Sequence, residues 1–146
     1  MDITTIKPTV LAIIGAAGAT AAFMLGGWDT ALQTLLIFMA IDYITGLLVA
    51  GVFHKSAKSQ GGALESKAGY QGLCRKGMVL LIILVSTQLD KMSGTDVIRN
   101  AVIIGYIANE TVSIIENAGL MGIPIPDVIR RAIDILKTKS ETPLKG

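Results

Sequence analysis

The sequence predicts an all-α integral membrane helical bundle with about four transmembrane helices and a C-terminal amphipathic cytoplasmic helix. Hydrophobic residues make up 51% of the 146 residues and charged residues only 16%. The mean hydropathy of +0.61 is too high for an ordinary soluble domain of this size. Four apolar stretches alternate with short polar segments, and an amphipathic pattern follows the last of them.

The first predicted span covers residues 8–27, which contain no charged side chain and suffice to cross the ~30 Å hydrocarbon core. We prefer a retained helix to a cleaved signal peptide, because the preceding segment is weakly charged and the apolar run is long. Small residues recur at helical spacing here and in the second span, which favours close helix contacts in lipid over mere Gly/Ala richness. The predicted packing residues are Gly15, Gly18, Ala22, Gly26, Gly46 and Ala50.

The second predicted span covers residues 31–53 and has a single charge, Asp42, near its centre. The basic loop 54–76 follows it, with Glu65 as its one acidic residue. By the positive-inside rule this loop is cytoplasmic, which places both termini inside and the turn at Trp28 outside. The basic residues that we expect at lipid headgroups, or as determinants of topology, are Lys55, Lys58, Lys67, Arg75 and Lys76.

The third predicted span covers residues 72–89. Its thirteen strongly apolar residues are too few to cross the bilayer alone, so flanking residues complete the span. The basic residues at its inner end extend to the lipid headgroups. The fourth covers residues 97–121. We expect Asp96 to cap its start, and Pro124 and Pro126 to prevent its continuation.

The fourth span carries a polar stripe. Its polar residues follow spacings of three and four, which predicts that they share one helix face. A carboxylate at mid-depth costs about 3 kcal/mol, and we expect no deeply placed Lys or Arg to pair with all of those in the spans, since Arg99 lies near the outer end. The polar groups therefore either line an oligomer's interior or hold one subunit together. They are Asp42, Tyr106, Asn109, Glu110, Ser113, Glu116 and Asn117.

These spans form a predicted transmembrane domain, residues 1–123, and residues 124–146 form a second unit. A helix beginning at Asp127 has one apolar face and one charged face. With Arg130 and Arg131 it would lie on the cytoplasmic leaflet against anionic lipid. A helix that docks on protein is the alternative.

The residues with reactive side chains do not form a recognisable catalytic, cofactor or metal site. Cys74 is the single cysteine and His54 the single histidine, so neither a disulfide nor a metal-ligand motif is predicted. A formal net charge of +2, without basic residues interleaved with aromatic ones, excludes nucleic acid as a partner. We therefore predict no enzyme activity and no cofactor.

Four motifs resemble one family: DYITG at 42–46, SKAGYQG at 66–72 followed by Arg75 and Lys76, NETVSIIEN at 109–117, and GIPIP at 122–126. They are similar to the phage holins that include the clostridial toxin-secretion holins. The likeness runs from about Leu32 to Leu136, is loose in the first span and over residues 60–64, and departs at Thr111, where relatives favour a smaller residue.

The resemblance implies a protein of the bacterial inner membrane that forms homo-oligomers and opens timed pores or lesions. Through them an endolysin, which is released rather than bound, or a toxin leaves the cytoplasm. Membrane lipid and an antiholin are further implied partners. Two other classes stay open from the residues themselves: a small ion channel or transporter-like protein, and a membrane-anchored holin inhibitor. The absence of an evident inverted repeat argues against a transporter.

Overall fold

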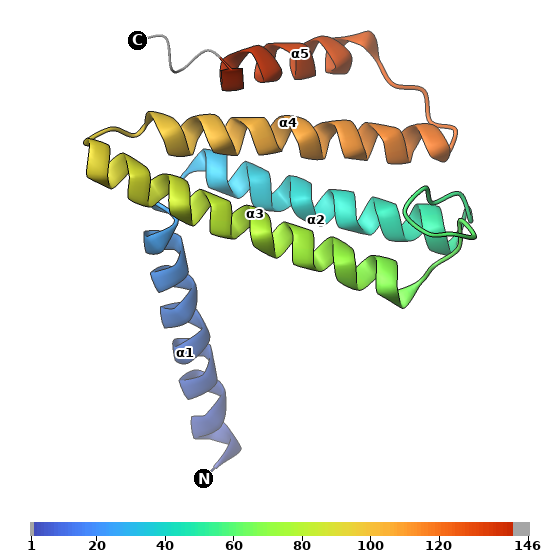
Figure 1. Ribbon diagram of the computed structural model, residues 1–146. Helices are drawn as coiled ribbons and strands as arrows, with labels where there is room; N and C mark the ends of the chain where they lie inside the picture. The colour runs from blue at the N-terminus through green and yellow to red at the C-terminus, as the bar shows by residue number, and fades with distance from the viewer. Residues whose placement is uncertain (1, 142–146) are drawn as a thin grey trace.

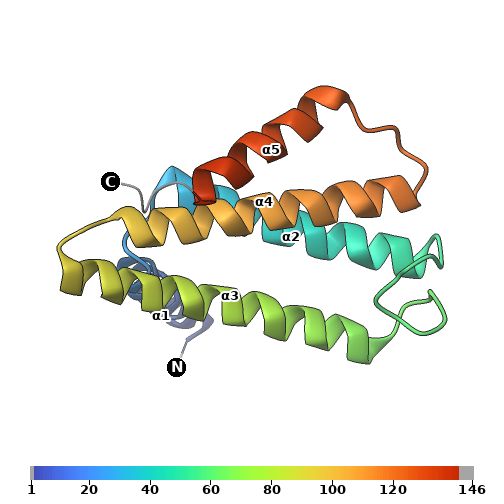
Figure 2. The same cartoon turned by 45° about the horizontal axis from the view of Figure 1, so that its top comes forward.

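The computed structural model describes residues 2–141, and all its regular elements are α-helices (Figure 1). Three of them, α2, α3 and α4, lie side by side as a bundle; α5 returns along α4, and α1 points away from the bundle (Figures 1 and 2). The helices are α1 (Ile3–Met24), α2 (Thr30–Gly51), α3 (Ser66–Ser93), α4 (Val97–Leu120) and α5 (Asp127–Glu141).

The apolar core lies where α4 packs against α2 and α3. Leu35 and Met39 of α2 meet Ile83 of α3 and Ile103 and Ile107 of α4, and all five side chains are buried. These residues recur at spacings of three to four on their helices, so each helix presents one stripe to the others. Direct contact between α2 and α3 is slight, and α4 therefore joins them.

Within the described residues, three helices are long and apolar enough to cross a membrane: α1 from Thr4, α2 and α3. This confirms a helical membrane protein. α4 falls outside this group and carries Arg99, Glu110 and Glu116. The fourth span, and with it the division at residue 123, stays a prediction.

No residue in the apolar window of α1 is buried. A Cβ atom added at Gly15 or Gly18 would meet nothing within 4 Å, so these two glycines have no neighbour inside the subunit, whereas Ala22 near the end of the helix is half-buried. The prediction that these glycines pack against a helix therefore concerns other copies. Gly26 was wrongly placed in that series: the helix ends at Met24, and Gly26 has a φ of +89° in the following turn.

The third helix begins at Ser66 and runs for 28 residues, whereas the sequence predicted a span at 72–89 preceded by a loop. Gly69 and Gly72 were expected to weaken this segment. Instead both glycines lie inside a continuous helix and face Tyr43 of α2: a Cβ atom added at Gly69 would lie 3.5 Å from the Tyr43 hydroxyl group, and one added at Gly72 would lie 3.7 Å from the Tyr43 ring. Lys67, Arg75 and Lys76 consequently lie on a helix, not in a loop.

The C-terminal helix docks on protein in this structure. Ile133 is buried, and Leu136 packs against the core cluster of α2, α3 and α4. Arg130 and Arg131 are exposed. Of the two alternatives for this helix, the structure therefore shows the contact with protein, and its location on lipid stays a prediction. Residues 142–146 of the predicted tail lie outside the described residues.

The start of α4 is capped by Asp90, not by Asp96 as the sequence suggested. The Asp90 carboxylate accepts hydrogen bonds from the backbone amides of Ile98 (3.0 Å) and Arg99 (2.8 Å) and from the Thr95 hydroxyl (2.7 Å). Asp96 makes no capping hydrogen bond. Because the turn is short, a residue near the end of α3 reaches the free amides of α4.

Replacing Asp90 with Ala should destabilise the protein by about 1–2 kcal/mol, because two helix-terminal amides and a hydroxyl lose their acceptor. Thermal unfolding in detergent micelles would measure this loss. The matched control is Asp96→Ala in the same turn, which should leave the unfolding midpoint nearly unchanged. Equal effects of the two substitutions would contradict the assignment.

Candidate functional site

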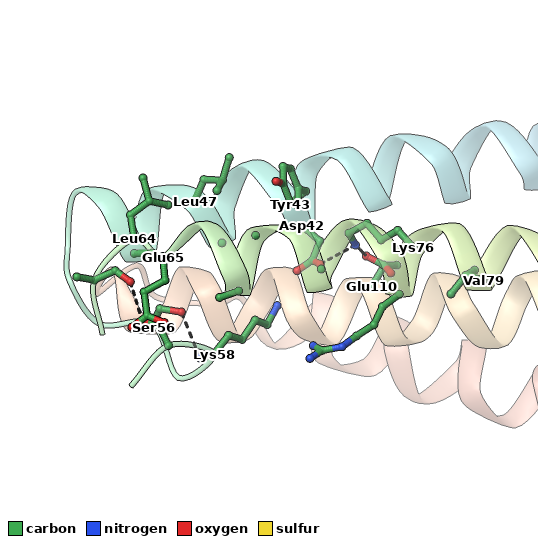
Figure 3. A pocket seen from close by; sticks show the side chains of 18 residues that line it. Asp42, Tyr43, Leu47, Ser56, Lys58, Leu64, Glu65, Lys76, Val79 and Glu110 are labelled. Carbon is green, nitrogen blue, oxygen red and sulfur yellow. Dashed lines mark hydrogen bonds and ion pairs between the residues drawn. The ribbon is translucent and has the colours of Figure 1, made fainter. Parts of the chain in front are cut away.

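A buried charge cluster joins the three bundle helices. The Lys76 ammonium on α3 donates to Asp42 Oδ2 on α2 (2.8 Å) and to Glu110 Oε2 on α4 (2.6 Å), as Figure 3 shows. The exposed fractions of these side chains are 15%, 7% and 12%. One cation thus bridges carboxylates from two other helices, each of which would be costly to bury without it.

A second polar layer lies beside this cluster. Asn117 on α4 donates through Nδ2 to the Thr45 hydroxyl (2.9 Å) and to Asp42 Oδ1 (3.2 Å) on α2. Thr45 in turn donates to the backbone carbonyl of Asp42 (3.1 Å). Both carboxylate oxygens of Asp42 are therefore hydrogen-bonded. In the described part of the chain, every buried side-chain nitrogen or oxygen has a partner.

A cavity of about 170 Å³ adjoins the cluster and lies between α2, α3 and the loop that joins them (Figure 3). Asp42, Lys76 and Glu110 form part of its wall, and Lys58 comes from the loop, close enough to act electrostatically on Asp42. The two carboxylates and the Lys76 ammonium carry a net charge of −1, which Lys58 offsets. This arrangement holds helices together, and it contains no nucleophile paired with a base.

The predicted polar stripe is divided between two faces of α4. Glu110 and Asn117 point into the bundle and Tyr106 and Ser113 are partly buried, whereas Asn109 and Glu116 are exposed. The prediction of a single shared face was wrong, because at 100° per residue Asn109 and Glu116 lie roughly 70–90° from the mean direction of the other four side chains.

No basic residue was expected to pair with all the carboxylates of the spans, and Lys76 pairs with two of them, Asp42 and Glu110. We had placed Lys76 at the headgroups because it stood at the edge of the predicted span. The signal for its true position is its spacing: Gly69, Gly72, Lys76 and Ile83 follow one face of α3, and that face is turned inward. Arg75, one residue earlier, is exposed.

The remaining predicted residues fall into two groups. Gly46 and Ala50 lie on the inner face of α2: a Cβ atom at Gly46 would be 3.9 Å from Asn117 Nδ2, and Ala50 is buried. Lys55, Lys58 and Lys67 are exposed at the loop end of the bundle. Their role at headgroups stays a prediction.

A second ion pair, which sequence reasoning missed, fixes the opposite end of α4. The buried Arg99 donates through Nη1 to Asp29 Oδ2 (2.6 Å), and through Nε and Nη2 to the carbonyls of Leu25 (2.5 Å) and Gly27 (3.2 Å). It thereby ties α4 to the turn between α1 and α2. This hydrogen bond from Arg99 holds the pKa of Asp29 below its usual range.

Comparison with known protein families gives a match to the bacteriophage holin family over residues 19–138. The chain belongs to this family. A probable holin of Bacillus phage phi105 is 31% identical over 111 residues, which cover 75% of this chain and 76% of that protein. An uncharacterized 14.9 kDa protein of Clostridium perfringens is 36% identical over 124 residues, which cover 84% of this chain and 88% of that protein. No solved structure matches significantly.

The holin match includes both ion-pair clusters and most of α5, and it begins inside α1. Family membership and the apolar helices together support an inner-membrane protein. Among residues 2–141 of this holin, no group of three or more His, Cys, Asp or Glu side chains could hold a metal ion. Cys74 is exposed.

Replacing Lys76 with Met should destabilise the bundle by about 3 kcal/mol or more, because two largely buried carboxylates lose their cation. Chemical unfolding in micelles would measure this. Arg75→Met on the exposed side is the control and should have little effect. Adding Asp42→Asn and Glu110→Gln to Lys76→Met should restore much of the stability. If no stability were recovered, the loss in Lys76→Met could not be attributed to the broken ion pairs.

The contribution of Asp29 to stability should depend on pH. Since the folded-state pKa is lowered, the ionised carboxylate stabilises the fold above the unfolded-state pKa of about 3.9, and this stabilisation is lost as the pH falls through the folded-state value. The difference in unfolding free energy between wild type and Asp29→Asn should therefore be constant near neutral pH and shrink below about pH 4. If this difference in unfolding free energy did not change with pH, the stabilising role of the ionised Asp29 carboxylate would be refuted.

Proposed function

We propose that this holin-family chain oligomerises in the inner membrane and forms timed pores or lesions that release an endolysin, or a toxin, from the cytoplasm. The probable holin from Bacillus phage phi105 is similar over three quarters of the chain and supports this function. The endolysin passes through the lesion and is not bound. An antiholin would act by joining the same assembly.

The observation that carries the proposal is the exposure of Asn109 and Glu116 on α4. The other carboxylates of the bundle have partners inside the subunit, but these two side chains have none among the described hydrogen bonds. If α4 spans the bilayer, an ionised Glu116 facing lipid would cost up to about 3 kcal/mol, depending on its depth. Neighbouring copies, or water enclosed by them, remove this cost.

We therefore propose that fewer residues are available to line the lesion in the closed subunit than the sequence predicted. Glu116 contacts water or a neighbour in the closed subunit, and Asn109 can meet a neighbour once α5 has left it. Asp42 and Glu110 border the cavity beside the loop, and together with Tyr106, Ser113 and Asn117 they line the lesion only if α4 separates from α2 and α3. Because Lys76 holds those helices together, separation of its ion pairs is the step that opens the subunit.

The proposed orientation places both termini and the loop between α2 and α3 in the cytoplasm. Exposed Lys55, Lys58, Lys67 and Arg75 gather at that end of the bundle, as the positive-inside rule requires. The Arg99–Asp29 pair then lies at the outer surface. A charge that moves across the bilayer gains or loses about 2.3 kcal/mol per 100 mV of membrane potential, so a rearrangement that moves the charged groups of α4 within the membrane would respond to collapse of that potential.

Inducible expression in bacteria, with and without a cytoplasmic endolysin, tests the proposal. Expression alone should stop growth and release a folded cytoplasmic reporter, and expression with endolysin should lyse the cells. An ion channel would depolarise cells without releasing the reporter, and an inhibitor of another holin would be harmless alone. Either result would overturn the proposal.

The pair Asn109→Leu and Glu116→Leu should delay lysis and reduce reporter release by about tenfold, since lipid can then replace water or a neighbour on this face. The control is Gln88→Leu, which removes an exposed polar group from α3. Lysis timing measures the effect at matched protein levels in the membrane. Unchanged timing would show that this face of α4 has no part in the lesion.

A further inference from the structure

The C-terminal helix covers α4 incompletely. Its second half is seated: Ile133 is buried, and the Ser140 Cβ lies 3.5 Å from the position of a Cβ added at Gly105. Its first half diverges from α4, as Figure 2 shows, and Val128 and Ile129 are exposed there. α5 is thus held at one end and free at the other.

Beneath α5 lies one continuous row of α4. Its residues follow alternating spacings of three and four, which place them on a single face: Val102, Gly105, Asn109, Val112 and Glu116. The second half of α5 lies over Gly105 and Asn109, and an open groove of about 500 Å³ runs there between α3, α4 and α5. Glu116, further along the row, is exposed.

The chemistry of this row suits a second copy of α4. Gly105 permits close approach of another helix, Val102 and Val112 supply apolar contact, and Asn109 can hydrogen-bond across a symmetric helix pair. In a membrane, copies share one orientation, so a two-fold axis along the bilayer normal brings each residue of the row opposite its own equivalent. Two Glu116 carboxyl groups that meet in this way need water or a shared proton between them, because like charges repel.

Docked α5 and a spanning α4 exclude each other. Gly105 is the ninth of the 24 residues of α4, well inside the helix. Ser140 contacts it, which carries Lys137 and Lys139 to the same depth. Charged side chains avoid this depth in hydrocarbon. When α4 spans the bilayer, α5 must leave it, and the strongly amphipathic α5 is then suited to the membrane surface.

We propose that the row Val102–Gly105–Asn109–Val112–Glu116 is the contact surface between copies of this chain, and that α5 is its intramolecular cover. The proposal deepens the proposed function and rests on it for the need to assemble. It assigns the surface through which copies meet and makes α5 undocking a condition for that contact.

Two cysteine variants of the full chain, in a Cys74→Ser background, test both parts in isolated inner membranes. Gly105→Cys alone should form interchain disulfides on oxidation, because the row meets its equivalent. Val85→Cys, exposed on α3, is the control and should form few. Interchain disulfides no more abundant at position 105 than at position 85 would overturn the contact surface.

Gly105→Cys with Ser140→Cys should close an intrachain disulfide, since the two Cβ atoms are at a suitable separation. Oxidation should then lower energy transfer between copies labelled with fluorescent proteins at the N-terminus by about tenfold, and reductant should restore it. Unchanged energy transfer in the oxidised, tethered protein would overturn the role of α5 as a cover.

These readouts do not depend on lesion formation. Wild-type protein that releases no reporter from cells, while the Gly105→Cys variant still cross-links between chains, would contradict the proposed function and support the contact surface. Normal reporter release by a protein that does not cross-link at position 105 would support the proposed function and contradict the contact surface.

Discussion

The bundle depends on one ammonium group. Lys76 is the point at which α3 is joined by charge to both α2 and α4. Direct contact between α2 and α3 is slight, so the position of α3 depends on α4 and on this cation. In a low-dielectric interior, a cation between two carboxylates is favourable only while all three charges stay together. A change that separates them therefore affects three helices at once.

Among the four long helices, α4 is the one without an apolar stretch long enough to cross a membrane, and it is held at three points along its length. Asp90 and Arg99 fix its beginning, Glu110 joins the charge cluster at its middle, and Asn117 bonds to α2 near its end. These contacts satisfy polar groups that hydrocarbon would not accept. The polar side chains left outside, on the face beneath α5, thereby become the ones that a neighbouring copy or water must satisfy.

The two outer helices, α1 and α5, differ from this bundle in making few contacts inside the subunit. α1 has no buried residue in its apolar window, and the family match begins within it. α5 is seated by its second half alone, and its charged face is exposed. Helices with little contact inside the subunit are the ones that can move without unfolding it. We therefore expect copies to meet in the membrane through α1 and through the face of α4 that α5 uncovers when it moves.

The sequence by itself determined the helical membrane class, the second span and its central Asp42, the end of α4 before the two prolines, and the amphipathic last helix. Hydropathy and helical periodicity are local properties, and these features depend on nothing else. The tertiary structure decided which side chains pair with one another. That Lys76 turns inward while Arg75 stays out, that Asp90 rather than Asp96 caps α4, and that the polar stripe divides between two faces all follow from residues far apart in the chain. No local pattern contains such a contact, because it exists only once α2, α3 and α4 are packed.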